Sequence, residues 1–159
     1  MRKSEHRKGI AHGQGIELWP DGTTFRGHYE DGKKDGYGMF KWADGTSYEG
    51  DMKDDQLCGL GTLELKDDRH YEGHFFNSKM HGEGTFMWPD GKKYIGAYKD
   101  GKKHGKGKLI LADGQEYFGT WVQGKADGEI QHKDKEGKKM AKSWTWVSSR
   151  RKLPNCFKI

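Results

Sequence analysis

The sequence has few of the residues that fill an ordinary globular core. Val occurs only twice, and Phe, Ile, Leu and Val together number 23 of 159 residues. That share lies below the roughly 20% at which a packed aliphatic core becomes doubtful. Disorder does not follow, because disordered chains combine high net charge with few aromatic residues, whereas this chain has a net charge of +5 and is 13% aromatic. We therefore expect a chain that orders itself with aromatic side chains and its 25 glycines.

Cysteine and long apolar runs are also scarce. The two cysteines are Cys58 and Cys156, and no signal-peptide pattern follows Met1. These features favour a reducing compartment over a disulfide framework. No run approaches the roughly 20 apolar residues that a membrane span needs. We expect a cytoplasmic protein.

The positive charge lies mainly at the two ends of the chain. Residues 1–11 carry +3 and residues 125–159 carry +6, whereas residues 12–124 carry −4. Within that middle part, residues 44–72 sum to −6 and residues 92–108 to +6. Two interpretations remain open: an ordinary solvated surface, or basic ends that meet an acidic filament or an anionic membrane. Nucleic acid is not expected, because the aromatic residues are not interleaved with Lys and Arg.

What the sequence has in quantity is repetition. An aromatic residue recurs every 23 residues and is followed two places later by glycine, and a Gly-x-Gly pair recurs with the same period. An Asp-Gly turn, or Asp67-Asp68 in one copy, lies between them. A fixed period of this length predicts tandem structural units. The aromatic positions are Phe25, Tyr48, Tyr71, Tyr94 and Tyr117.

Each unit is predicted to be a β-hairpin. Asp-Gly between two alternating runs, as at Asp113-Gly114, is a strong hairpin signal, since both residues tolerate positive φ. The alternation places glycine and aromatic residues on one face and mostly polar residues on the other. A glycine inside a strand costs roughly 0.5–1 kcal/mol relative to alanine. We therefore expect the glycines to make room for rings that lie flat over the neighbouring backbone.

These features predict an all-β fold, an elongated, twisted, single-layer antiparallel sheet of stacked β-hairpin repeats. A basic N-terminal segment, residues 1–8, is expected to precede the repeats. The array itself is expected at residues 9–124, as five 23-residue units of which the first is partial. A degenerate capping repeat, residues 125–147, and a basic tail, residues 148–159, are expected to follow.

The repeat resembles the MORN (membrane occupation and recognition nexus) repeat. The best copy runs from Tyr94-Ile95-Gly96 through Gly101-Lys102-Lys103-His104-Gly105-Lys106-Gly107 to Asp113-Gly114, and the resemblance covers Gly9 to about Gly128. Asp35 and Cys58 replace the histidine of the pattern, and Asp68 replaces the turn glycine. Families built from such repeats look like scaffolds at membranes and in the cytoskeleton, radial-spoke-head and other ciliary proteins among them. Residues 117–124 are similar to late repeats of radial-spoke-head proteins, which implies a ciliary axoneme or another cytoskeletal assembly.

No motif for catalysis or cofactor binding is convincing. The spelling Gly-x-x-x-x-Gly-Lys at 27–33, 96–102 and 119–125 lacks the Ser or Thr and the helix of a phosphate-binding loop. His12, His81 and His104 occupy equivalent sites, about 10 Å apart between neighbouring repeats, which is too far for one zinc ion. Each is expected to close its own turn. We expect no enzyme, no cofactor and no metal site.

A lone sheet leaves its aromatic face without a second layer. This face must curl on itself, be covered by the tail, or receive a partner such as a helix or an extended peptide of a larger assembly. Each partner-binding candidate is equally a packing residue. Trp144 and Trp146 are expected to cap the last hairpin, with partner binding as the alternative. The candidates on the concave aromatic face are Trp19, Trp42, Trp88, Tyr94, Tyr98 and Trp121, and the candidate tail contacts are Trp144, Trp146, Arg150, Arg151 and Lys152.

The sequence thus predicts a non-catalytic protein–protein interaction scaffold that holds a partner segment along its aromatic face. Two alternatives stay open. One is a peripheral membrane tether that binds anionic phospholipids through its basic ends. The other is a regulatory subunit of another enzyme.

Overall fold

The computed structural model describes residues 2–7, 9–136, 138 and 144–146. The chain divides into two compact units, unit 1 up to Ser78 and unit 2 from Lys79 onward. The described residues form strands and turns and contain no helix. Unit 1 contains β1 (Arg2–Arg7), β2 (Ile10–Leu18), β3 (Thr24–Glu30), β4 (Lys33–Lys41), β5 (Ser47–Lys53), β6 (Gln56–Glu64) and β7 (His70–Phe76). Unit 2 contains β8 (Lys79–Met87), β9 (Lys93–Lys99), β10 (Lys102–Ile110), β11 (Glu116–Val122), β12 (Lys125–Lys133) and β13 (Trp144–Trp146).

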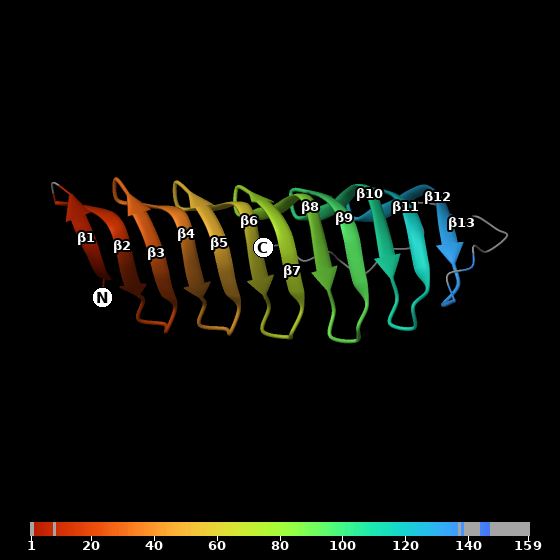
Figure 1. Ribbon diagram of the computed structural model, residues 1–159, viewed down its shortest axis with the longest axis horizontal. Coiled ribbons are helices and arrows are strands. Elements are labelled where there is room, and N and C mark those ends of the chain that lie inside the picture. Colours follow the sequence, from red (N-terminus) through yellow and green to blue (C-terminus); the bar gives the residue numbers. More distant parts are fainter. Residues whose placement is uncertain (1, 8, 137, 139–143, 147–159) are drawn as a thin grey trace. The chain divides into compact units, whose positions relative to one another are not determined.

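Within each unit every strand pairs antiparallel with the next one in sequence. Figure 1 shows the strands of each unit side by side in this order. The prediction of an all-β chain of consecutive hairpins is confirmed. The strands follow the 23-residue period because each copy supplies a seven-residue and a nine-residue strand.

The Asp-Gly segments form three-residue loops. In the loop after β4, the N–H of Gly45 donates to the carbonyl of Trp42 at 3.1 Å, and the N–H of Trp42 donates to the carbonyl of Thr46 at 2.8 Å. Gly45 has φ 94°, whereas Asp44 is not left-handed and instead accepts the Thr46 N–H at 2.8 Å. The predicted hairpin turn is therefore a type I turn whose final glycine alone is left-handed.

The two-residue turns lie at the opposite ends of the strands, along the upper edge in Figure 1. Asp31 and Gly32 have φ values of 49° and 83°, as a type I′ turn requires. The N–H of Gly32 donates to the carbonyl of Ala11 in the preceding repeat at 2.8 Å. Asp55 takes the position of Gly32 in the next repeat. Its N–H donates to the Lys34 carbonyl at 2.9 Å, and its carboxylate accepts the N–H of Lys34 at 2.8 Å. These tight turns therefore link each repeat to the one before it.

The strands bend sharply next to the tight turns. In the β3–β4 pair, His28 alone faces the three residues 35–37, so β4 bulges, with Gly36 at φ 100°. Residues four apart on a straight strand are about 13 Å apart, yet the rings of Phe25 and Tyr29 are 5.6 Å apart and edge to face. Leaning side chains alone do not close that gap, and a bulge bends its strand. The strand therefore folds back over its own aromatic face.

The glycines of the strands lie directly under aromatic rings. A Cβ atom on Gly61 would come within 2.5 Å of the ring of Tyr48, and one on Gly38 within 2.6 Å of the Phe25 ring. Alanine would not fit at either position. This geometry confirms that the strand glycines make room for rings.

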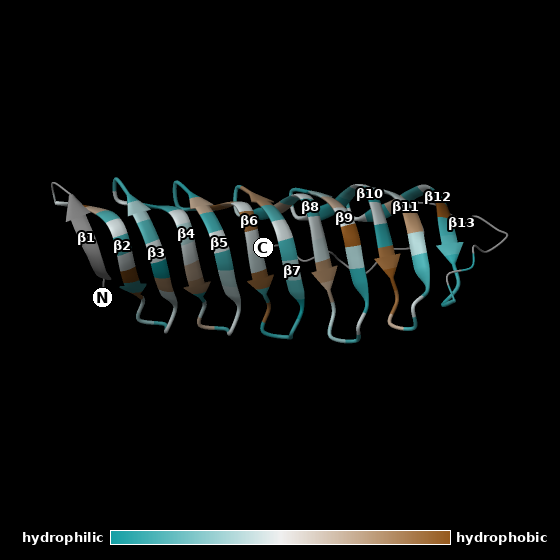
Figure 2. Cartoon of the chain, in the orientation of Figure 1, coloured by the Kyte–Doolittle hydropathy of each residue, from teal (hydrophilic) through white to brown (hydrophobic). Residues whose placement is uncertain are grey.

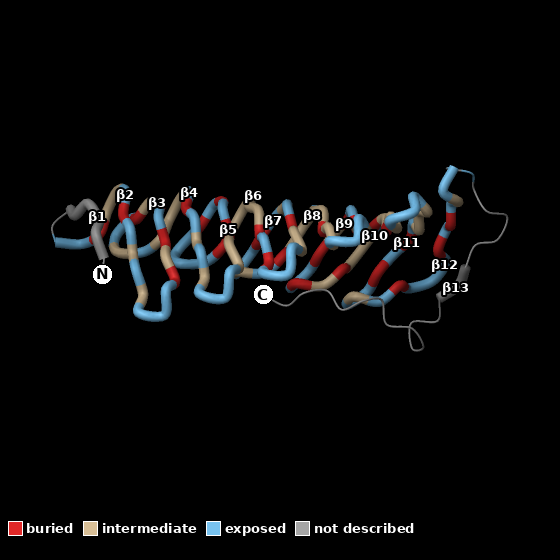
Figure 3. The backbone as a smooth tube through the Cα atoms, turned by 90° about the horizontal axis from the view of Figure 1, so that it is seen from below, coloured by how far each residue is buried: buried red, intermediate tan, exposed pale blue. Residues whose placement is uncertain are grey.

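The rings and a few aliphatic side chains form the core of each unit. Figure 2 shows hydrophobic and hydrophilic residues interspersed along the strands, and Figure 3 shows the buried residues spread over successive strands. The sheet thus supplies both sides of its own core. The largest fully buried side chains are Phe25, Tyr29, Tyr48, Leu63 and Tyr71 in unit 1 and Met80, Phe86, Tyr94, Lys103, Trp121 and Ile130 in unit 2.

Candidate functional site

The six aromatic residues predicted to bind a partner separate into two groups. Tyr94, Tyr98 and Trp121 are at most 3% exposed, so they belong to the core of unit 2 and do not line an open surface. Their placement on a partner-accessible concave face is therefore corrected, and the physical reason is the bend at the glycine bulges. Trp19, Trp42 and Trp88 are only partly buried. Of the six, only these three can reach a partner.

In unit 1, Trp19 and Trp42 form a rim beside the three-residue loops. The Phe40 ring lies 5.9 Å from the Trp19 ring and 5.0 Å from the Trp42 ring, stacked with both. Rings held in this way lose little freedom when a partner binds. We call Trp19 and Trp42 the tryptophan rim.

A lysine lies beneath this rim. The Lys34 ammonium is 5.3 Å from the Trp19 ring centre and 5.1 Å from that of Phe25, and similar distances separate it from Tyr29 and Phe40. Its nearer carboxylate partner is Glu17, 3.6 Å away, and Asp55 lies 4.0 Å away. Glu17 also accepts the Tyr29 hydroxyl hydrogen bond at 2.9 Å. Cation–π contacts are strongest when the cation is desolvated, and the Lys34 side chain is only 13% exposed.

Trp88 occupies the equivalent position in unit 2 but has different neighbours. The ammonium of Lys92 lies 4.6 Å from its ring centre, and that of Lys103 lies 5.3 Å away. The Phe86 ring is 4.5 Å away and tilted. Two cations therefore contact this indole, whereas Trp19 and Trp42 share one stacked phenyl ring.

Sequence reasoning missed the buried lysines. Lys34 and Lys103 occupy the position that Ala11, Leu57 and Met80 fill in other repeats. Lys103 is only 1% exposed. Aligning the 23-residue copies position by position would have shown two lysines in an otherwise apolar column.

The tail candidates fall largely outside the described residues. Trp144 and Trp146 bound β13, whose backbone pairs with β12 at residues 128–130. A further strand therefore covers this edge of β12. Arg150, Arg151 and Lys152 lie outside the described residues.

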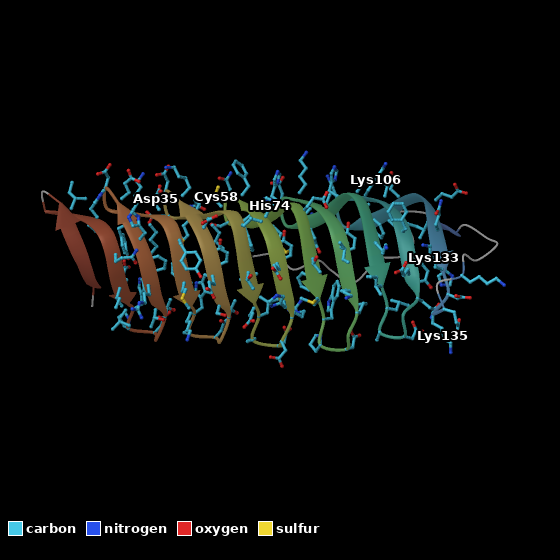
Figure 4. All side chains as sticks on the ribbon, in the orientation of Figure 1. Asp35, Cys58, His74, Lys106, Lys133 and Lys135 are labelled. Atoms are coloured by element: carbon cyan, nitrogen blue, oxygen red, sulfur yellow. The ribbon has the colours of Figure 1, made fainter. Side chains whose placement is uncertain are left out.

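The histidine positions of the repeat lie at the bulges near the tight turns. Asp35 and Cys58, which replace histidine there, are labelled in Figure 4 toward the same edge of unit 1. The Lys53 ammonium, 3.0 Å from the Asp35 carboxylate, lowers the pKa of Asp35. The N–H of Gln123 reaches Nδ1 of His104 at 3.5 Å. In the described part of the chain, no three His, Cys, Asp or Glu side chains are grouped to hold a metal ion.

A second feature that sequence reasoning missed is a pocket of about 490 Å³ at the tight-turn edge of unit 2. Three lysines line it, together with Asp100, His104 and Gln123. The sequence signal was the charge of +6 over residues 92–108. That sum does not reveal which side chains gather at one place. The described residues include no helix that could span a membrane.

The family model of the MORN repeat matches six segments of the chain. They are residues 7–24, 25–47, 48–68, 71–93, 94–116 and 117–129. Together they cover well over half of the chain. No curated protein sequence matches it significantly.

Solved structures are similar to this chain at low sequence identity. The TCP domain of Drosophila melanogaster SAS-4 (dCPAP), in complex with a proline-rich motif of Ana2 (dSTIL), is 13% identical, with 80% of this chain and 76% of that chain covered and a TM-score of 0.48. The wild-type TCP10 domain of Danio rerio CPAP is 17% identical, with coverages of 84% and 68% and a TM-score of 0.36. The TCP10c domain of Drosophila melanogaster Sas-4 is 12% identical, with coverages of 88% and 97% and a TM-score of 0.38. Such values say nothing about the partners of this chain.

Proposed function

Because the chain belongs to the MORN-repeat family, we propose that it is a non-catalytic scaffold that holds a segment of another protein. The observation that carries this proposal is the tryptophan rim. Trp19 and Trp42 are fixed by stacking on Phe40 and remain partly exposed. Tryptophan is enriched among the residues that dominate binding energy at protein interfaces.

The rim suits an extended or helical segment with apolar side chains. Trp19 and Trp42 are one repeat apart, and two strands advance a sheet by about 10 Å. Two apolar side chains three residues apart on a polyproline II segment, or seven residues apart on a helix, lie on one side of the segment and span a similar distance. The proposed partner is therefore a protein segment with apolar anchors at one of these spacings.

The test compares the full chain with the double variant Trp19→Leu/Trp42→Leu. Leucine already occupies the equivalent position at Leu65 and Leu111, so the variant is expected to fold. A partner identified by cross-linking the wild type should bind the purified variant at least about tenfold more weakly, the equivalent of about 1.4 kcal/mol. Undiminished binding would exclude the rim as the docking site.

A matched control also replaces two apolar side chains, but at a surface of unit 2 and not at the tryptophan rim. The double variant Ile95→Ser/Phe118→Ser removes two exposed apolar side chains from unit 2 and should leave the affinity unchanged. If this control loses binding and the rim variant does not, the docking surface lies in unit 2. If the wild type captures no partner that rebinds after purification, the scaffold proposal is refuted.

We further propose that the scaffold works in the cytoplasm within a cytoskeletal assembly such as a ciliary axoneme. The resemblance of residues 117–124 to late repeats of radial-spoke-head proteins supports this location. Imaging of the tagged full chain in ciliated cells tests it. Signal along the axoneme is expected, and a purely diffuse signal would refute it.

A further inference from the structure

The lysine-lined pocket of unit 2 is unlike the corresponding turns that the structure describes elsewhere. Its lining includes Lys79, Lys99 and Lys102, with Asp100 as the single carboxylate. A volume of about 490 Å³ falls within the range of small-molecule sites, roughly 300–1,000 Å³. The pocket therefore has the size and the charge to hold an anionic molecule.

Two of these lysines face each other across the tight turn. Lys99 and Lys102 are register partners at the start of the β9–β10 pair. Like charges directly opposite each other destabilise an antiparallel pair. The equivalent partners in unit 1 are Glu30 and Lys33, which have opposite charges. The repeat at residues 94–116 thus keeps a local electrostatic cost that a bound anion would remove.

The three ammonium groups are not neutralised by the described residues. No carboxylate oxygen of residues 9–136 forms an ion pair with any of them. Lys108, which lies on β10 like Lys102, is by contrast paired with Glu116 at 3.7 Å. The pocket lysines are therefore available to a ligand.

His104 adds a ring nitrogen to this set. Its Nδ1 accepts the Gln123 N–H at 3.5 Å, so in the neutral ring the proton is carried by Nε2. In that tautomer the Nε2–H of His104 joins the three lysines as a donor for the acceptor-only oxygens of a phosphate, whereas Asp100 and Gln123 are the lining side chains that carry oxygen acceptors.

We propose that this pocket binds a small ligand that carries two or more phosphate groups. Lysine binds phosphate as a point charge. Lys79 is the first residue of β8, Lys99 the last of β9 and Lys102 the first of β10, so three adjacent strands each supply one lysine. The volume exceeds what a single phosphate fills. The proposed binding differs from that of a phosphate-binding loop, because lysine side chains and not backbone N–H groups contact the anion. The site is separate from the tryptophan rim, so either proposal can fail alone.

The experiment titrates the full chain with inositol hexakisphosphate and follows binding by calorimetry and by the melting temperature. The wild type should bind and should melt at a higher temperature with the ligand. The triple variant Lys79→Gln/Lys99→Gln/Lys102→Gln should lose about tenfold or more in affinity. Without ligand it should melt no lower than the wild type, because the Lys99–Lys102 repulsion is gone. The melting temperature without ligand shows whether the variant is folded, so a loss of affinity can be assigned to the pocket and not to unfolding.

A matched variant controls for net charge. Lys93→Gln/Lys106→Gln/Lys133→Gln removes the same number of positive charges from unit 2 outside the pocket, at positions of which Lys106 and Lys133 are labelled in Figure 4. It should keep its affinity within about threefold. An equal loss in both variants would overturn the proposal, since the attraction would then be diffuse. Absence of binding by the wild type would overturn it as well.

A second arm identifies the source of the phosphates. Flotation with phosphatidylcholine vesicles, with and without phosphatidylinositol bisphosphate, presents the same chemistry as a lipid headgroup. Binding to inositol hexakisphosphate but not to the vesicles supports a soluble ligand. Binding to the phosphoinositide vesicles that the pocket variant alone loses supports a headgroup in the same pocket. Vesicle binding that the pocket variant retains, without binding of the soluble probe, would overturn the proposal.

Discussion

The hydroxyl of Tyr48 donates a hydrogen bond to the backbone carbonyl of Asp51, three residues further along β5, at 2.7 Å. Asp51 is the residue at which the β5–β6 register shifts, so the bulge takes this carbonyl out of the regular ladder and the tyrosine hydroxyl supplies a donor. Burial raises the pKa of Tyr48 well above its usual value, so the hydroxyl keeps its proton and remains a donor at any ordinary pH. The Tyr48 side chain thus packs on Gly61 and also gives the Asp51 carbonyl at the bulge a hydrogen-bond donor.

Removing this hydroxyl should destabilise the chain. Tyr48→Phe is expected to lower the free energy of unfolding by about 1 kcal/mol, because a part-buried hydrogen bond is lost. Urea unfolding of the full chain measures it. The control is Tyr37→Phe, since the Tyr37 hydroxyl donates to Glu49 on an exposed surface and its loss should cost less than about 0.5 kcal/mol. Equal effects of the two variants would contradict the role assigned to the Tyr48 hydroxyl.

The strand glycines should differ in their tolerance of alanine according to what lies above them. A Cβ on Gly96 would lie 2.5 Å from the Cα of Gly107 and 2.7 Å from the carbonyl oxygen of Lys106, neither of which can move aside. Gly96→Ala should therefore cost about 3 kcal/mol or more. At Gly119 the nearest atom is the tip of the Ile130 side chain, so Gly119→Ala should cost about 1 kcal/mol. Thermal unfolding compares them, and a larger loss for Gly119→Ala would contradict this account.

Lys34 should stabilise unit 1 in spite of its apolar surroundings. Lys34→Met places there the residue found at the equivalent Met80, yet it leaves the Glu17 carboxylate without the ammonium 3.6 Å away. We expect a loss of about 1–2 kcal/mol. A double-mutant cycle with Glu17→Gln should show a coupling of about 1 kcal/mol. The neighbouring exposed variant Lys33→Met should cost less than about 0.5 kcal/mol, and zero coupling would refute the ion pair.

Acid should weaken the three-residue loops. The backbone N–H of Thr46 lowers the pKa of Asp44 below its ordinary 3.8, and Thr23 and Gln115 do the same for Asp21 and Asp113. A carboxylate whose folded pKa is lowered adds stability above its unfolded pKa and loses it as the pH falls through the folded value. The melting temperature should therefore fall as the pH drops below about 4.

The control for this pH effect replaces all three carboxylates with amides. Asp21→Asn/Asp44→Asn/Asp113→Asn keeps an oxygen acceptor for each backbone N–H but cannot be protonated in this range. Its melting temperature should fall less than that of the wild type between pH 5 and pH 3, a window taken from the ordinary carboxyl value. Parallel curves for the two proteins would assign the acid sensitivity to other carboxylates.

The hairpins could be predicted from the sequence because they rest on local chemistry. The Asp-Gly loops and the alternation around Tyr94 and Gly96 need no distant partner to be recognised. The bend at Gly36 could not be predicted in this way, since the spacing of glycines does not say that three residues of β4 oppose His28 alone. The sequence therefore left open whether the aromatic face curls on itself, is covered by the tail or receives a partner, and the bend buries Tyr94, Tyr98 and Trp121.

The lysine pocket was beyond sequence reasoning for a related reason. Lys79 and Lys99 are 20 residues apart in the sequence, and only the pairing of β8 with β9 and of β9 with β10 brings their ends to one edge of unit 2. A charge sum over a window counts lysines on both faces alike. Lys106, for example, contributes to the same sum but does not line the pocket.

A backbone hydrogen bond joins each tight turn to the repeat before it, so the array can change length only in steps of whole 23-residue copies. Gly32 bonds to Ala11 and Gly101 to Met80, and in both cases the donor lies 21 positions after the acceptor. A gene duplication or deletion that spans one whole copy presents the same donor to an equivalent acceptor, so the array can grow or shrink without disturbing its neighbours. A change of any other length moves ring positions onto polar ones, and selection would remove it.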